Sequence, residues 1–151
     1  MKKPLLMCFL FLTLILGACG GGSLEGETVS ITGALIGEDQ NGFRENIKAI
    51  EEATGIIVTY QGSDNFEQEI QIQMESGDTP DFALFPQPGG VVDAANRGYL
   101  TPLADLDIDL EEYQNNFSSY LVGLGTVDGV IYGGANAANL KSIVWYQPAE
   151  F

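Results

Sequence analysis

The side chains that could do chemistry in this chain are mainly carboxylates. The sequence has 21 Asp and Glu residues and no histidine. A Ser-His-Asp or Cys-His catalytic site, and a metal site that uses histidine, are therefore excluded within these residues. A carboxylate pair such as Glu111 and Glu112 could serve a glycosidase, but it falls at the start of an expected, exposed helix. We therefore expect a protein that is not an enzyme and needs no cofactor.

A second carboxylate pattern suggests calcium but does not complete the motif. Asp105, Asp107 and Asp109 alternate like the first ligands of an EF-hand loop. The glycine required at the sixth position is absent, because Leu110 stands there, and Asn116 replaces the bidentate glutamate. We expect these aspartates to form a polar linker and a helix cap, and we predict no metal site.

The amino terminus has the pattern of an export signal. Lys2 and Lys3 precede an apolar run over 5–16, which is too short to cross a membrane, and small residues lead to Cys19. The Leu-Gly-Ala-Cys tetrad resembles the lipobox of bacterial lipoproteins, in which the cysteine receives a lipid. An ordinary secretory signal is the alternative. The pattern predicts a signal peptide over 1–18, and a lipidated Cys19 with a flexible tether over 19–27.

This signal also predicts where the protein lies. Cys8 is lost on processing, so the mature chain has no second thiol for a disulfide. Lipid chains on Cys19 would anchor the protein to the outer face of the cytoplasmic membrane, or leave it in the outer membrane or periplasm of a two-membrane cell. The formal net charge of −15 disfavours nucleic acid as a partner. A solubility adaptation to salty surroundings is the plainer interpretation of this charge.

Strand and helix signals alternate beyond the tether. Runs that contain β-branched residues predict strands at Thr28–Leu35, Ile56–Tyr60, Val130–Tyr132 and Ser142–Tyr146, and the apolar run Asp81–Phe85 after Pro80 predicts a buried strand. Helical spacing of apolar residues predicts helices from Phe43 to Thr54, from Phe66 to near Gly77, over Val91–Asn96 and from Leu110 to Leu124. We expect a loop over 37–42, with Asn41 capping the first helix, and an Asp64–Glu67 capping box on the second. The alternation predicts an α/β fold with a largely parallel sheet flanked by helices.

Several motifs in this order resemble a known family. The run Gly77–Phe85 (GDTPDFALF) is similar to the Gly-x-x-Pro-Asp-hydrophobic signature of extracellular solute-binding proteins of the maltose-binding-protein type. The stretches Glu51–Val58, Gly98–Leu103, Asp128–Gly133 and Ser142–Tyr146 resemble the family's segments at corresponding places. Each motif is weak, but their order and spacing together are specific.

The resemblance implies a two-lobed receptor of an ABC importer that closes on its ligand by a hinge and presents it to permease subunits. It implies a class II periplasmic-binding-protein-like fold, with the N-terminal lobe at 28–135 and the first interlobe crossover and start of the second lobe at 136–151. The family is longer and returns a C-terminal segment to the first lobe, so we expect an N-terminal fragment of marginal stability. The expected ligand is a sugar or oligosaccharide.

The loops at the carboxyl ends of the strands are where a ligand is expected in such a sheet. Hydroxyl-binding groups and aromatic faces in these loops and on the crossover predict a ligand site at Glu38, Asp39, Asp64, Phe85, Gln87, Asn136, Asn139, Lys141 and Trp145. Structural alternatives stay open for several of them: a helix cap for Asp64, core packing for Phe85 and Trp145, and a hinge salt bridge for Lys141. A polyol, polyamine or peptide ligand, or a structural lipoprotein without a transported ligand, is the alternative function.

Overall fold

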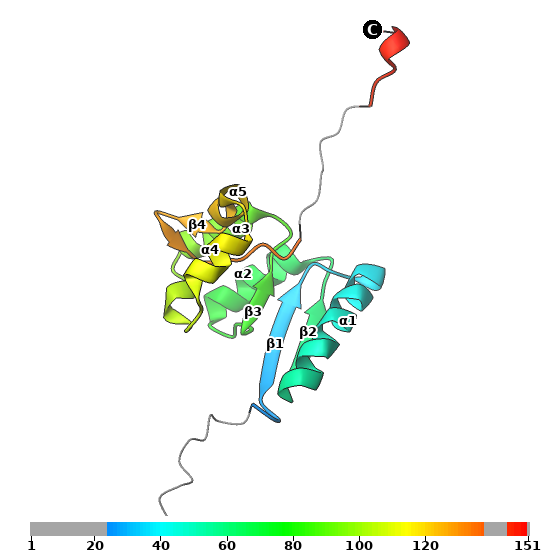
Figure 1. Ribbon diagram of the computed structural model, residues 1–151. Helices are drawn as coiled ribbons and strands as arrows, with labels where there is room; N and C mark the ends of the chain where they lie inside the picture. Colours follow the sequence, from blue (N-terminus) through cyan, green and yellow to red (C-terminus); the bar gives the residue numbers. More distant parts are fainter. Residues whose placement is uncertain (1–23, 138–144, 151) are drawn as a thin grey trace, which may run out of the picture.

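The computed structural model describes residues 24–137 and 145–150. Its centre is a three-stranded parallel sheet of β1 (Thr28–Gly33), β2 (Ile57–Gly62) and β3 (Phe82–Leu84), in the order β2-β1-β3. The chain moves from the central strand to one edge and then to the other (Figure 1). Right-handed crossovers must then place the two connecting helices on opposite faces. The predicted α/β fold with a parallel sheet is confirmed.

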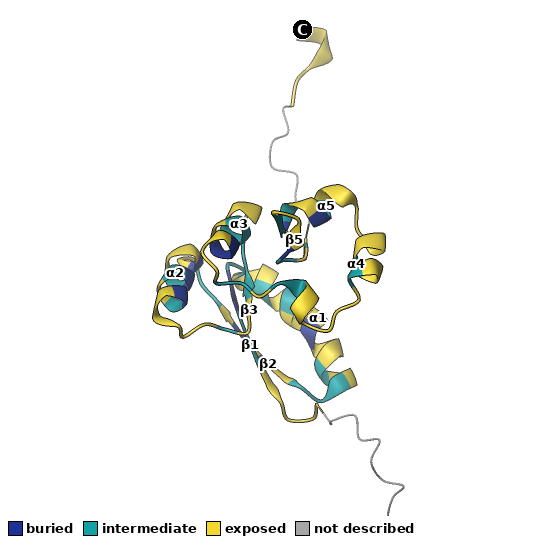
Figure 2. Cartoon of the chain, turned by 90° about the vertical axis from the view of Figure 1, so that its left-hand side faces the viewer, coloured by how far each residue is buried: buried dark blue, intermediate teal, exposed yellow. Residues whose placement is uncertain are grey.

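Helix α1 (Gly37–Thr54) lies on one side of this sheet, and α2 (Phe66–Ser76) and α3 (Pro88–Asn96) lie on the other (Figure 2). The buried side chains of this part are Ile47 of α1 and Val58 and Tyr60 of β2. On the second side, the core is a cluster built around a fully buried phenylalanine: Phe66, Ile70, Met74 and Ala94, with Ala83, Phe85, Tyr99 and Leu100 packed against it. Helices thus lie on both faces of the sheet, but one face of β2 stays open, because its alternate residues Ile57, Thr59 and Gln61 are exposed.

The prediction of a loop over 37–42 is wrong, because α1 begins at Gly37. The residue before the helix is Ile36, in extended conformation, and Asn41 lies inside the helix instead of capping it. Glu38 and Asp39 fall in the first turn, where carboxylates interact favourably with the helix dipole. The predicted stop is confirmed: Gly55 takes the left-handed conformation, with φ at 75°.

The capping box predicted for α2 is also wrong. The residue before this helix is Asn65, and no side chain caps it. Strand β2 continues to Gly62, so only three residues remain for the turn, and Ser63 accepts a hydrogen bond from the Asn65 amide at 3.1 Å. Asp64 is therefore one residue too early to cap. Helix α3 also starts earlier than predicted, because Pro88 suits the first turn of a helix.

The residues after α3 form a small second layer of η1 (Leu103–Asp105), α4 (Leu110–Asn116), α5 (Ser119–Leu124), β4 (Thr126–Val127) and β5 (Val130–Ile131). The Asp109 cap is confirmed: its carboxylate accepts from the Glu112 amide at 2.9 Å. The single helix expected from Leu110 to Leu124 is wrong, since Phe117 is extended and Ser118 caps a new helix.

Strands β4 and β5 form an antiparallel hairpin that the sequence did not predict as a pair. Asp128 and Gly129 turn it, with φ of 50° and 83°, as two-residue hairpin turns require. Of the strand expected at Ser142–Tyr146, residues 142–144 lie outside the described residues, and Trp145 and Tyr146 are not in a strand. The predicted signal peptide and Cys19 also lie outside the described residues. In the described part, no helix has the length and apolarity of a membrane span.

Candidate functional site

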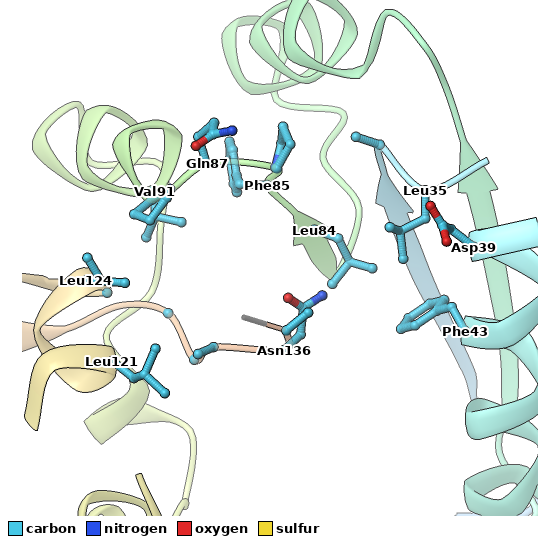
Figure 3. A pocket seen from close by; sticks show the side chains of 18 of the residues that line it. Leu35, Asp39, Phe43, Leu84, Phe85, Gln87, Val91, Leu121, Leu124 and Asn136 are labelled. Atoms are coloured by element: carbon cyan, nitrogen blue, oxygen red, sulfur yellow. The ribbon is translucent and has the colours of Figure 1, made fainter. Parts of the chain in front are cut away.

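A pocket of about 690 Å³ opens between α1, the carboxyl end of β3 and the segment after β5 (Figure 3). It is lined by Ala34, Leu35, Asp39, Phe43, Asn46, Ile47, Ile50, Leu84, Phe85, Pro86, Gln87, Pro88, Val91, Leu121, Leu124, Gly125, Gly133, Gly134, Ala135, Asn136 and Ala137. The loops after β1 and β3 flank it, and the chain leaves these two strands toward opposite faces. This is the switch point at which open α/β sheets bind ligands.

Helix α1 supplies the first wall. Asp39, Phe43 and Asn46 are spaced by four and three residues, so they share one helix face. Figure 3 shows Asp39 and Phe43 on the helix side of the pocket, with Leu35 of the preceding loop beside them. The Phe43 ring packs edge-on against the Tyr60 ring, with 5.0 Å between centroids. This wall therefore offers a carboxylate, an amide and an aromatic ring that is held in place from behind.

The second wall follows β3. The Phe85 ring meets the buried Phe66 ring edge-on at 5.4 Å, which anchors it to the core of the second side. Gln87 lies two residues after Phe85 and directly before α3, whose Val91 also lines the pocket. Because Phe85 is half-buried, it serves both as core and as pocket wall, so the two interpretations of this residue do not exclude each other.

The third wall joins α5 to the segment after the β4–β5 hairpin. The carbonyl of Gly125 accepts from the amides of Tyr132, at 2.9 Å, and Gly133, at 3.3 Å. A Cβ on Gly125 would overlap the Gly133 carbonyl oxygen, so only glycine allows this approach. The contact fixes the start of the segment over 133–137, which contains Asn136.

The structure brings four of the predicted site residues together: Asp39, Phe85, Gln87 and Asn136 line the same pocket. Glu38 and Asp64 are exposed and do not line it. Trp145 is 89% exposed, and Asn139 and Lys141 lie outside the described residues. Whether any of these residues binds a ligand stays a prediction.

Sequence reasoning missed Phe43, Asn46, Leu84, Val91, Leu121 and Leu124 as lining residues. The signal for Phe43 and Asn46 was available, because they continue the helical spacing from Asp39. It was hidden by the loop expected over 37–42, which separated Asp39 from the helix. Leu121 and Leu124 meet the pocket only through tertiary packing.

The polar side chains that line the pocket can form hydrogen bonds with a ligand. Asp39 is the ionisable side chain among the described lining residues, and Asn46, Gln87 and Asn136 supply amides. The apolar remainder includes two aromatic rings. Within 24–137 and 145–150, no three His, Cys, Asp or Glu side chains gather where they could hold a metal ion. The arrangement suits a neutral ligand with several hydroxyl groups.

A second pocket of about 580 Å³ lies on the other side of β3 and shares Leu84, Phe85 and Asn136 with the first. Asp81 is at its border and is held by β1: the amide and hydroxyl of Ser30 both donate to one Asp81 oxygen, at 2.8 and 2.7 Å. The Ser30 hydroxyl accepts in turn from the Asp81 amide at 3.0 Å. These hydrogen bonds from Ser30 lower the pKa of the Asp81 carboxyl. Asp81, the aspartate of the Pro-Asp pair, thus joins the start of β3 to β1.

Comparison with known proteins gives one matching family model, that of bacterial extracellular solute-binding proteins, over residues 34–148. Osmoprotective compounds-binding protein GgtB of Synechocystis sp. is 38% identical over 142 residues, which are 91% of this chain and 34% of that protein. Alpha-glucosides-binding periplasmic protein AglE of Rhizobium meliloti is 37% identical over 141 residues, or 87% of this chain and 30% of that protein. The chain thus spans about a third of the length of these relatives.

Solved structures agree on the fold. A solute-binding protein of an ABC transporter from Thermotoga lettingae, bound with alpha-D-tagatose, matches with a TM-score of 0.57 and 27% identity, over 72% of this chain and 28% of that one. The maltotriose-binding protein of Thermus thermophilus matches with a TM-score of 0.56 and 17% identity, over 70% of this chain and 28% of that one.

Proposed function

The chain belongs to the bacterial extracellular solute-binding proteins, and we propose that it forms one side of a cleft that captures a sugar or oligosaccharide outside the cytoplasmic membrane. The captured solute is then delivered to the permease subunits of an ABC transporter. The protein binds and releases its ligand without chemical change, so its action is conformational: closure around the ligand marks the loaded state.

The observation on which this proposal rests is the pocket at the switch point of the sheet, which Asp39, Gln87 and Asn136 line from three different walls. Sugar hydroxyls both donate and accept hydrogen bonds. A carboxylate accepts two or more of them, and each amide can donate and accept at once. The Phe43 and Phe85 rings supply apolar surface for the carbon face of a sugar ring. A pocket of about 690 Å³ has room for more than one such ring.

The relatives support a neutral, hydroxyl-rich ligand. One is named for alpha-glucosides, and the tagatose-bound structure contains a monosaccharide. A second candidate ligand, a small osmoprotective solute, is favoured by the relative that is named for such compounds. Both classes fit a pocket whose lining has three amides and one carboxylate. A polyamine or a peptide receives no such support.

The amino terminus supports the proposed location. We propose that Cys19 carries a lipid and that 20–27 form a flexible tether between membrane and domain. A receptor tethered in this way stays near its permease at high effective concentration.

Isothermal titration calorimetry with a solute panel tests the function. The panel contains maltose, trehalose, maltotriose and glycine betaine, with spermidine and a tripeptide as non-sugar controls. We expect saturable binding of at least one glucoside and no heat from the two controls. Binding of glycine betaine without any glucoside would favour the second candidate, an osmoprotective solute, over a sugar. Binding of spermidine or the tripeptide alone would contradict the proposal, as would the absence of binding to every member of the panel by a folded protein.

A further inference from the structure

The loop between β1 and α1 is held by a tyrosine that does not itself line the pocket. The Tyr60 hydroxyl accepts a hydrogen bond from the Leu35 amide and donates one to the Leu35 carbonyl, both at 3.0 Å. One side chain therefore satisfies both backbone groups of one loop residue. Leu35 is not part of either strand or helix, so no regular backbone ladder fixes it.

The geometry around this contact depends on two glycines. A Cβ on Gly62 would overlap the Leu35 carbonyl oxygen, and a Cβ on Gly33 would lie 2.9 Å from the Tyr60 hydroxyl oxygen. Both φ values lie outside the left-handed region, so glycine is needed here for space. Strands β1 and β2 thus end in residues that let Leu35 approach the tyrosine closely.

Tyr60 also supports the next part of the same wall. It is 7% exposed, and its ring packs edge-on against the pocket-lining Phe43. Burial raises the pKa of the Tyr60 hydroxyl, and the backbone hydrogen bond from Leu35 opposes this shift in part. The hydroxyl therefore keeps its proton at neutral pH and can donate to the Leu35 carbonyl.

We propose that Tyr60 is a positioning residue for the solute site: it fixes the β1–α1 loop through Leu35 and so sets where α1 begins and where Asp39 stands. Asp39 lies four residues after Leu35, in the first turn of α1. A shift of the loop therefore moves the Asp39 carboxylate relative to Gln87 and Asn136. This proposal deepens the proposed function and rests on it for the link to solute binding.

The test is Tyr60→Phe, which removes one oxygen and keeps the ring that packs on Phe43. Amide exchange of the ligand-free chain, followed by NMR, should be about tenfold faster at Leu35 than in wild type, relative to the amides of the β1–β2 ladder. Affinity for maltotriose should fall about tenfold by calorimetry, because the Asp39 wall is no longer preorganised. The matched control is Thr32→Val, which removes another buried hydroxyl, the one that donates to the Gln61 carbonyl at 3.1 Å.

The control should lower stability without selective change at Leu35 or in affinity. The proposal is wrong if Tyr60→Phe speeds exchange uniformly over β1 and β2, if it leaves Leu35 exchange at the wild-type value, or if a solute that wild type binds is bound with unchanged affinity. Gly62→Ala is a second variant, which should displace Leu35 from its other side and give the same selective exchange. If wild type does not bind maltotriose, the function proposed for that solute fails, whereas the exchange result still decides the role of Tyr60.

Discussion

At the scale of residues, several side chains that are partly or fully exposed bind the backbone or a side chain of another element. Asp81 and Ser30 exchange three hydrogen bonds between β3 and β1, although both lie near the sheet's surface. Glu51 reaches from the end of α1 to the Val58 amide of β2 at 2.7 Å. Arg97 contacts Glu75 and Asp93 and lies over the Tyr99 ring. The contacts of Asp81 with Ser30, of Glu51 with Val58 and of Arg97 with Glu75 join neighbouring elements, so their loss should affect where elements lie.

The Asp81 contact predicts a dependence of stability on pH. The hydrogen bonds from Ser30 lower the pKa of this carboxyl in the folded chain. The stabilisation is therefore complete above the pKa of the unfolded chain and is lost as pH falls through the lowered folded value. We expect Asp81→Asn to flatten the acid limb of the melting temperature against pH, measured by circular dichroism.

The control for this experiment is Asp78→Asn, the same charge change three residues earlier on an exposed position. It should leave the slope of the acid limb close to that of wild type. An equal flattening in both variants would mean that net charge, and not the Ser30 contact, causes the effect.

Asp39 and Glu38 form a matched pair for the solute site. Both carboxylates lie in the first turn of α1, but only Asp39 lines the pocket. We expect Asp39→Asn to weaken solute binding by about tenfold, because a hydrogen bond to a charged acceptor is lost. Glu38→Gln should bind as wild type does. Calorimetry with the tightest-binding member of the panel measures both, and equal affinities in the two variants would contradict the assignment of Asp39.

At the scale of elements, the third wall of the pocket depends on one close approach between α5 and the segment after β5. Gly125 and Gly133 face each other without side chains, and the hairpin between them closes with a tight turn. The hairpin therefore brings the chain back to Gly125, and the residues that follow, 133–137, line the pocket. The contact between Gly125 and Gly133 thus fixes the start of the segment that contains Asn136.

Gly125→Ala tests this arrangement. The added methyl group would overlap the Gly133 carbonyl, so we expect a loss of about 1–3 kcal/mol in the free energy of unfolding, measured with urea. Gly123→Ala is the control two residues earlier, inside α5, where an added Cβ meets nothing within 4 Å. It should be neutral or slightly stabilising, because alanine favours helix. A stable Gly125→Ala variant with unchanged solute affinity would contradict the role given to this contact.

At the scale of the whole molecule, charge is the dominant property. The formal net charge is −15, and α1 ends with acidic residues and no basic one in its last turn. Like charges of this number destabilise the compact state by mutual repulsion. Added salt screens this repulsion, with a screening length of about 10 Å at 0.1 M.

We therefore expect the melting temperature to rise by several degrees between about 0.02 M and about 0.5 M NaCl, measured by scanning calorimetry. Sodium sulfate at equal ionic strength is the control, because screening depends on ionic strength whereas strengthened burial of apolar surface depends on the anion. Equal shifts in the two salts support repulsion as the cause. A shift confined to sulfate would show that apolar burial, and not charge, limits stability.

The sequence by itself determined the alternation of strands and helices from β1 to α3, the parallel sheet and the family. The elements and the sheet follow from local signals: β-branched runs, helical spacing, and glycines such as Gly55 and Gly77 that end helices in the left-handed conformation. The family follows from the resemblance of several motifs, in order, to those of its members. It also placed Asp39, Phe85, Gln87 and Asn136 at strand ends or on the crossover, where they do line one pocket. Short-range propensity and the fixed geometry of a parallel sheet are enough for such inferences.

Only the tertiary structure decided the start of α1, the break between α4 and α5 and the β4–β5 pairing. Helix α1 begins at Gly37, although glycine is a weak helix former. It begins there because Tyr60, 25 residues after Leu35, holds Leu35 through two hydrogen bonds. Gly125 similarly meets Gly133 across a hairpin. Each contact joins residues that are distant in sequence, and its energy outweighs the small local preferences from which a sequence is interpreted. The wall of the pocket that carries Asp39 is therefore a product of packing.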